Sequence, residues 1–264
     1  MMERQPRWYP AIKVRCSRRS YVRNRAVGTD ERKRLHEVCD GFRPYSGVRV
    51  QFIDEPPDDI FANALGFYGN IKGAPAFLAF IGDTSDPNMQ EKMGYTGEAA
   101  VLEATSLGLG TCWVALTYNA RAVKSIIKLE KDEKVICVSP VGHTTERWSF
   151  EEKVLGGFGS NHQRKPLLSM VDGLPQAQWP HWARAAVEAA RLAPSAVNRQ
   201  PWGFDVQERS ITLSVKSRGP QFNVDMRLDC GIAMLHLELG AMSCGATGSW
   251  DFLTHPQVAR FNVK

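Results

Sequence analysis

An arginine-rich segment near the start of the chain combines residue types that suit an anionic ligand. Arg15, Ser17 and Arg19 occupy alternate positions in the sequence RCSRRSY, residues 15–21. Guanidinium and hydroxyl groups form charge-assisted hydrogen bonds with a phosphate, and a guanidinium also suits the electron-rich edge of a ring. The alternative is that these arginines are ordinary solvated charge on the surface.

A second segment, residues 193–202 with the sequence APSAVNRQPW, carries two amide side chains in a restrained turn. Pro194 and Pro201 limit the backbone on either side of Asn198 and Gln200. Amides held in this way can bind a ring that bears both donors and acceptors. A purely structural turn, in which Asn198 caps its own backbone, is the alternative.

Together the two segments resemble the flavin-binding motifs of the FMN-dependent nitroreductase family, written R-x-S-x-R and A-P-S-x-x-N-x-Q-P-W. The resemblance implies that FMN is the cofactor. It places Arg15 and Ser17, with Arg164 or Lys165, on the phosphate, and Arg19 beside the N1/O2 edge of the ring. A cation at that edge would raise the reduction potential of the flavin.

Two departures from the family pattern concern other contacts with the ring. Many members carry an Asn-x-x-Lys pair, whereas this chain has Asn70 and Lys72 at a shorter spacing. Many also have a Glu-Gly pair beside N5 of the flavin, where this chain has TYN at residues 117–119. No catalytic side chain and no metal site are expected. The candidate cofactor-binding residues are Arg15, Ser17, Arg19, Asn70, Lys72, Arg164, Lys165, Pro194, Ser195, Ala196, Asn198 and Gln200.

The separation of the two motifs predicts the architecture. In the family they lie close together in the chain, whereas here a further half-domain stands between them. Residues 74–146 resemble the later part of a nitroreductase subunit, with a strand at 74–80, a central helix at 94–110 and a strand at 135–143. Residues 181–253 repeat this plan, with helices at 182–192 and 229–245 and a strand at 211–215.

We therefore expect an α+β protein of nitroreductase-like fold, with two pseudo-repeated α/β halves that mimic a nitroreductase homodimer. The halves should be residues 1–170 and 171–264. Stripes of small residues on the two central helices would let them pack half against half, although ordinary core packing in one domain is the alternative. The stripes are Gly97, Val101, Ala104 and Gly108, and Ala233, Leu237, Gly240 and Cys244.

Local signals predict the remaining elements. Thr29 is a suitable N-cap and Gly41 a stop for a helix at residues 30–41. Alternating residues predict a strand at 48–53. A short helix is expected at 120–129, a surface loop at 149–165 and a linker at 174–180.

Each motif occurs once, which predicts a single site. The arginine motif lies in the first half and the amide turn in the second, whereas the equivalent stretch of the first half, residues 42–47, has neither Asn nor Gln. One composite FMN site per chain follows. The protein should act as a monomer that mimics a dimer, with a weak homodimer as an option.

Composition limits the alternatives. The chain of 264 residues is 43% hydrophobic, and no apolar run reaches the roughly 20 residues of a membrane span. The six cysteines show no C-x-x-C spacing, so we expect reduced thiols and a cytoplasmic location.

Residues 1–36 contain eleven Lys or Arg against three acidic residues. An organelle presequence would explain this charge, but its cleavage would remove the arginine motif. A nucleic-acid patch is the other option, but no zinc module, recognition helix or aromatic-basic pattern accompanies it. We expect no nucleic-acid partner and no membrane partner.

The resemblance implies ping-pong hydride transfer. NAD(P)H would reduce the flavin and leave, and a small electron-poor acceptor such as a nitroaromatic or a quinone would take its place. FMN carries the redox steps. His143 could donate a proton, but its match to the strand that ends in Pro-Val-Gly-His in the family implies a structural role. The alternatives are another flavin reaction such as enoate reduction, or a flavin-binding protein without turnover that acts as a sensor or carrier.

Replacing Arg15 or Arg19 with alanine should weaken FMN binding by about 1.5–3 kcal/mol, the usual contribution of a hydrogen bond to a charged group. Titration of the flavin-free protein with FMN measures the change. If both variants kept the wild-type flavin content, the arginine motif would lie outside the site.

Overall fold

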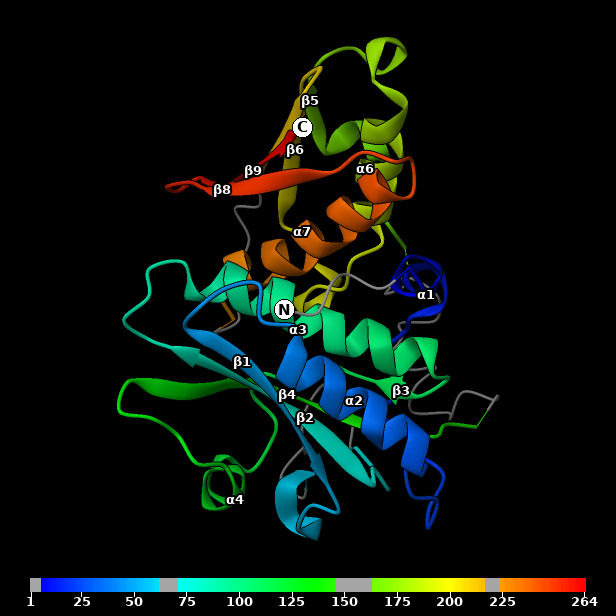
Figure 1. Cartoon of the computed structure of the whole chain (residues 1–264), viewed down its shortest axis with the longest axis vertical. Helices are drawn as coiled ribbons and strands as arrows, with labels where there is room; N and C mark the ends of the chain where they lie inside the picture. The colour runs from blue at the N-terminus through cyan, green and yellow to red at the C-terminus, as the bar shows by residue number, and fades with distance from the viewer. Residues whose placement is uncertain (1–5, 62–70, 146–162, 217–223) are drawn as a thin grey trace.

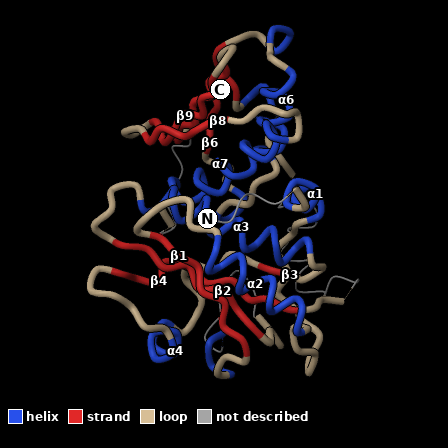
Figure 2. Tube along the Cα trace, viewed as in Figure 1, coloured by secondary structure: helices blue, strands red, loops and turns tan. Residues whose placement is uncertain are grey.

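The computed structural model describes residues 6–61, 71–145, 163–216 and 224–264. Two sheets lie at opposite ends of the molecule, and most of the helices gather between them (Figures 1 and 2). No helix in the described parts of the chain is long and apolar enough to cross a membrane.

The first sheet is antiparallel and has the strand order β1-β2-β4-β3. Its central strand β2 is buried along almost its whole length, because helices α2 (Thr29–Gly41) and α3 (Met89–Ser106) cover one face. A smaller apolar cluster, with the 3-10 helix η1 (Asp58–Phe61) and α4 (Ala120–Ile126), covers the other face. The strands are β1 (Val48–Asp54), β2 (Ala76–Asp83), β3 (Gly110–Thr111) and β4 (Glu133–Gly142).

The second sheet has the order β5-β6-β7-β9-β8. Its edge strand β5 pairs with β6 in parallel, and the other pairs are antiparallel. Helices α6 (His181–Arg191) and α7 (Met226–Met242) accompany this sheet. The strands are β5 (Val171–Gly173), β6 (Trp202–Val206), β7 (Ser210–Val215), β8 (Gly248–Phe252) and β9 (Gln257–Val263).

The two halves repeat the same plan, which confirms the predicted α+β fold with two pseudo-repeated halves. Apart from α4, which is inserted between β3 and β4, the series α2-β1-β2-α3-β3-β4 matches α6-β6-β7-α7-β8-β9, and the matched strands have the same order in their sheets. Equivalent positions also recur at equal spacing: Gly94, Gly108 and Trp113 correspond to Gly231, Gly245 and Trp250. The boundary expected at residue 170 stays a prediction, because one hydrophobic core extends through both halves.

Helices α3 and α7 pack directly against each other between the sheets, as predicted (Figure 1). Their backbones approach closely at Gly94 and Gly231, where a Cβ atom would collide with the carbonyl oxygens of Leu228 and Glu91 respectively. Two glycines of the predicted stripes do not form this contact. Gly97 instead faces Phe80 and Trp113, and Gly240 faces α6, because the crossing lies nearer the start of each helix.

Helix α1 (Trp8–Val14) is absent from the sequence-based expectations. Pro10 falls in its first turn, where the missing N–H has no helical partner to lose. The buried carboxylate of Glu103 on α3 accepts from the Trp8 indole at 2.7 Å and from two nitrogens of Arg7 at 2.7 and 2.8 Å. The helix ends one residue before Arg15, so these bonds help to place the arginine motif.

Other boundaries differ from the predictions in small ways. Gly28, rather than Thr29, caps α2, and its N–H donates to Glu31 at 2.7 Å. The expected helix at 120–129 ends at Ile126, and the linker at 174–180 contains a 3-10 turn, Gln176–Gln178. Strands β3, β5, β6, β8 and β9 were not predicted. Most of the loop expected at 149–165 lies outside the described residues.

Gly94→Ala or Gly231→Ala should lower the free energy of unfolding by at least about 2–3 kcal/mol, because the new methyl group would meet backbone atoms that cannot move aside. Urea unfolding measures the loss. Gly28→Ala is the matched control, since its methyl group would meet only the end of the Glu31 side chain. Equal effects at all three positions would mean that the helix crossing tolerates a wider spacing.

Candidate functional site

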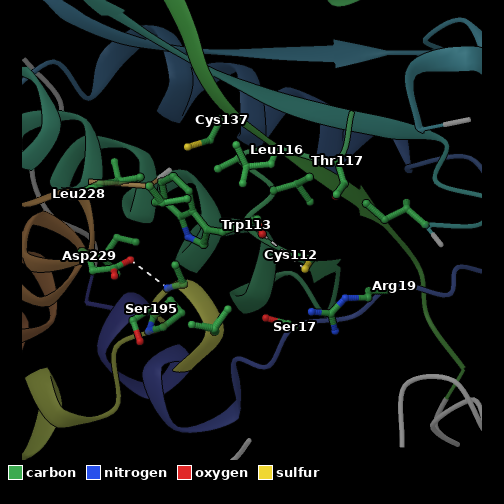
Figure 3. A pocket seen from close by; sticks show the side chains of 18 residues that line it. Ser17, Arg19, Cys112, Trp113, Leu116, Thr117, Cys137, Ser195, Leu228 and Asp229 are labelled. Atoms are coloured by element: carbon green, nitrogen blue, oxygen red, sulfur yellow. Dashed lines mark hydrogen bonds between the residues drawn. The ribbon is translucent and has the colours of Figure 1, made fainter. Parts of the chain in front are cut away.

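A cavity of about 400 Å³ lies where the two halves meet. The first half contributes Ser17, Arg19 and residues 112–117, and the second half contributes residues 194–197 and the start of α7. Figure 3 shows Asp229 and Ser195 on one side of the cavity and Arg19 on the other, with Trp113 between them. The cavity is therefore composite, as the separation of the two motifs predicts.

The arginine motif runs beside the first sheet as an extended segment. Ser17 forms a parallel bridge with Thr111 of β3, and the N–H of Lys72 donates to the carbonyl oxygen of Arg19 at 3.0 Å. Side chains alternate along an extended segment. Ser17 and Arg19 thus line the cavity, whereas Arg18 is buried on the other side and donates to Thr144 Oγ1 at 2.9 Å.

Three arginines gather next to this motif. Burial, together with the positive charges of Arg15 and Arg191, lowers the pKa of Arg164 to about 10. The Nε atoms of Arg15 and Arg191 are buried without a hydrogen-bond partner among the residues that the structure describes. Repelling guanidinium groups with unused donors form a site suited to an anion. We call Arg15, Arg164 and Arg191 the arginine cluster.

Sequence reasoning identified Arg15 and Arg164 but missed Arg191. Little in the sequence singles out Arg191, because a basic residue in the last turn of a helix is common and favourable on its own. Only the packing of α6 beside the first half brings this side chain toward the other two.

The turn after α6 has an unusual backbone. Val197, Asn198 and Gln200 have positive φ values of 50°, 55° and 47°. Each such residue costs on the order of 1–3 kcal/mol and persists only where its surroundings hold it. The turn therefore needs contacts beyond the flanking prolines to hold this backbone.

The predicted basic pair of the first half holds the turn of the second half. Arg164 donates to Asn198 Oδ1 at 2.6 Å, and the backbone N–H of Lys165 donates to Gln200 Oε1 at 2.8 Å. Lys165 Nζ also donates to the carbonyl oxygens of Arg199 and Gln200, both at 2.9 Å. Both amides therefore bind protein groups, and their expected contacts with a flavin ring stay a prediction.

Asp229 on α7 holds the same turn from the cavity side. Its Oδ1 accepts from the backbone N–H of Ala196 at 3.0 Å, a bond drawn in Figure 3, and its Oδ2 accepts from Arg199 Nε at 2.6 Å. Burial raises the pKa of Asp229 to about 6, although Arg199 acts in the opposite direction. Sequence reasoning did not single out this residue.

The remaining cofactor-binding residues predicted from the sequence differ in whether they line the cavity. Pro194, Ser195 and Ala196 line the cavity, as Ser17 and Arg19 do. Lys72 joins the arginine motif through its backbone, but its side chain is exposed and is not part of the cavity wall. Asn70 lies outside the described residues. No cluster of His, Cys, Asp or Glu suited to a metal occurs in the described parts of the chain.

The pseudo-equivalent position in the other half is filled by aromatic rings. Tyr95 and Phe252 correspond to Ile232 and Ala115, which line the cavity. Tyr45, from the segment that follows α2, packs edge-on against both rings, at centroid distances of 5.3 Å from Tyr95 and 5.1 Å from Phe252. We call this aromatic group the filled counterpart.

Comparison with known proteins now identifies the family. The family model described as "Putative TM nitroreductase" matches residues 7–241. The chain belongs to this nitroreductase family. No curated protein matches the chain in sequence.

Solved structures with the nitroreductase fold resemble this family member. The crystal structure of a "putative nitroreductase" from Thermotoga maritima superposes with a TM-score of 0.65 and 18% identity, covering 100% of this chain and 96% of that one. An FMN-dependent nitroreductase from Clostridium difficile R20291 has a TM-score of 0.43 and 19% identity, over 52% of this chain and 88% of its own. A nitroreductase with bound FMN from Bacteroides fragilis has a TM-score of 0.42 and 16% identity, over 54% of this chain and 91% of its own.

The stability of this nitroreductase-family protein should respond to the titration of Asp229. Because its folded pKa of about 6 lies above the unfolded value of 3.8, the folded state binds the proton more tightly. The contribution of Asp229 to stability should therefore fall as pH rises from about 4 to 6, by on the order of 2–3 kcal/mol.

Urea unfolding of the wild type and of Asp229→Asn across this pH range measures the effect. The stability of the wild type relative to the variant should be greater at pH 4 than at pH 7. Asp172→Asn is the control, because the Asp172 side chain is 64% exposed. A difference that stays constant with pH would contradict the prediction.

Proposed function

We propose that this protein is an FMN-dependent oxidoreductase that uses NAD(P)H to reduce small electron-poor acceptors such as nitroaromatics or quinones. The observation that supports this most strongly is the arginine cluster beside a largely apolar cavity at the junction of the halves. An anion site joined to a ring-sized cavity suits a flavin mononucleotide. Membership of the nitroreductase family supports the same function.

The residues present fit FMN at both of its ends. Arg15, Arg164 and Arg191 would hold the phosphate, whose charge of nearly −2 their guanidinium groups can neutralise. The unused Nε donors of Arg15 and Arg191 support this assignment. Arg19, which lines the cavity, would contact the ring near its N1/O2 edge, and Ser17, which was expected on the phosphate, lines the same cavity.

When bound, FMN supplies hydride transfer between the nicotinamide and the acceptor. The chain's own groups bind the cofactor, orient the reactants and exclude water from the cavity. Arg19 places positive charge beside the cavity, and Asp229 holds the turn that closes one side of it. Leu116 and Val197, which are 58% and 37% exposed, offer apolar surface at the cavity for a flat acceptor.

A nucleophilic side chain is not required for this reaction. Burial raises the pKa of the Cys137 thiol, which lines the cavity, so this group stays protonated. His143 Nε2 lies 3.3 Å from Glu31 Oε2 at the start of α2, which supports the structural role expected for this histidine.

We further propose one FMN per chain. The filled counterpart, Tyr45 with Tyr95 and Phe252, supports this because it takes up the space equivalent to the cavity.

The packing of α3 on α7 supports a monomer that acts as a pseudo-dimer, since it provides within one chain a contact between halves. All six cysteines are free thiols, which supports a location in the reducing cytoplasm.

Purified protein should carry FMN at a ratio of one per chain. Addition of NADH or NADPH without oxygen should bleach the flavin absorbance at about 450 nm, a general property of flavins. Released flavin measured against protein, with light scattering for mass, tests the stoichiometry. A subsequent addition of a nitroaromatic or a quinone should restore the absorbance.

Several results would decide between the alternatives. A yellow protein that neither nucleotide bleaches would favour a flavin sensor or carrier. A ratio near two would contradict the role of the filled counterpart. A colourless protein that takes up no FMN would refute the proposed function.

A further inference from the structure

A buried carboxylate joins the cavity wall to the helix packing between the halves. Glu98 on α3 is fully buried, and its Oε2 accepts from the Trp113 indole N–H at 2.8 Å. Trp113 lines the cavity and stacks on Phe80 with ring centroids 4.1 Å apart and an interplanar angle of 18°. Phe80 thus restrains one face of this indole, and Glu98 restrains its N–H.

The other oxygen of Glu98 contacts the second half. Oε1 lies 2.9 Å from Nε2 of His236 on α7, a residue that is also fully buried. The remaining ring nitrogen of His236 lies 3.2 Å from the carbonyl oxygen of Ala189. Ala189 belongs to α6, the helix that carries Arg191 and leads into the strained turn. Glu98 therefore connects the indole to the element that precedes the turn.

Glu98 also faces the arginine cluster. Its Oε1 lies 4.0 Å from Nε of Arg15, whose side chain is 6% exposed. The carboxylate thus lies between Trp113, at the ring end of the cavity, and Arg15, at the anion end. Burying a carboxylate is unfavourable unless hydrogen bonds and opposite charge compensate it, and apolar replacements are often as stable. Stability alone therefore does not explain this residue.

The other half contains a matched arrangement. Trp250, the counterpart of Trp113, donates from Nε1 to Oε2 of Glu238 at 2.9 Å. The same oxygen accepts from the hydroxyl of Tyr95 at 2.6 Å. Each central helix thus provides a buried glutamate that binds a tryptophan of its own half and a side chain of the other helix. Of these two glutamates, only Glu98 binds a tryptophan that lines the cavity, whereas Glu238 binds Tyr95 of the filled counterpart.

We infer that Glu98 is a positioning residue of the flavin site, which orients the Trp113 indole as a cavity wall and restrains the Arg15 guanidinium. This inference rests on the proposed function. Glu238 has the matching structural role without the connection to a ligand site. The two glutamates therefore separate helix packing from flavin binding.

Glu98→Met and Glu238→Met are the variants to compare, because both keep the side-chain volume and remove the acceptor. Both should lose some thermal stability. Glu98→Met should weaken FMN binding about tenfold or more, because the Trp113 indole and the Arg15 guanidinium would both lose the carboxylate that restrains them. Glu238→Met should bind FMN as the wild type does.

Glu98→Gln should recover only part of the affinity, because it restores the contacts with Trp113 and His236 but not the negative charge beside Arg15. Its amide oxygen can accept from Trp113, and its amide NH₂ can donate to His236 in a neutral tautomer whose other nitrogen donates to Ala189. Wild-type affinity in Glu98→Met would overturn the inference. So would equal weakening in Glu238→Met, because general helix packing would then explain both effects.

A flavin-independent measurement separates this inference from the proposed function. In the ¹⁵N-labelled protein, the indole N–H signals of Trp113 and Trp250 can be assigned by Trp113→Phe and Trp250→Phe. Glu98→Met should move the Trp113 signal and speed its exchange with solvent, and Glu238→Met should do so for Trp250. An unchanged Trp113 signal would refute the positioning role, whereas wild-type protein that binds no FMN would refute the proposed function.

Discussion

The close crossing of α3 and α7 is the constraint on which the rest of the structure depends. Gly94 and Gly231 leave no room for a side chain where the two backbones meet. This contact sets the distance between the sheets, and so brings the arginine motif of the first half to the turn of the second. The buried glutamates Glu98 and Glu238 add polar contacts on either side of the same helix pair. Apolar packing sets the spacing of the helices, and the hydrogen bonds specify their orientation.

A segment that crosses from the first half to the second holds the turn that lines the cavity. After the first sheet the chain crosses to the second half, where Arg164 and Lys165 bind the amides of the turn and β5 joins the edge of the second sheet. Positive φ at Val197, Asn198 and Gln200 is stable because bonds from the crossing segment and from Asp229 hold both sides of the turn. The halves are thus interdependent, since neither contains all the groups that shape the cavity.

Local spacing predicted much of this arrangement, and tertiary packing decided the rest. The alternation of Arg15, Ser17 and Arg19 survives in the structure because the segment is extended, and the plan of repeated helices and strands follows from motifs that each lie within a short stretch. Arg191, Glu98 and Asp229 have no local signature, because a helical arginine or acid is equally at home in solvent. Their roles arise only when α7 packs against α3 and α6 packs against α7. The stripe of Gly97 failed as a predictor because periodicity identifies a face of a helix but not the point at which two helices cross.

The aromatic filling opposite the cavity has a consequence for how such a protein can change. In a symmetric homodimer one gene encodes both sites, so every substitution is made twice and must suit both. Here Tyr45 and Phe252 occupy one position while Ala115 and the turn after α6 shape the other. With two repeated halves in one chain, one half can be filled with bulky side chains while the other keeps an open cavity. Two copies of one fold can in this way take on separate tasks within a single gene product.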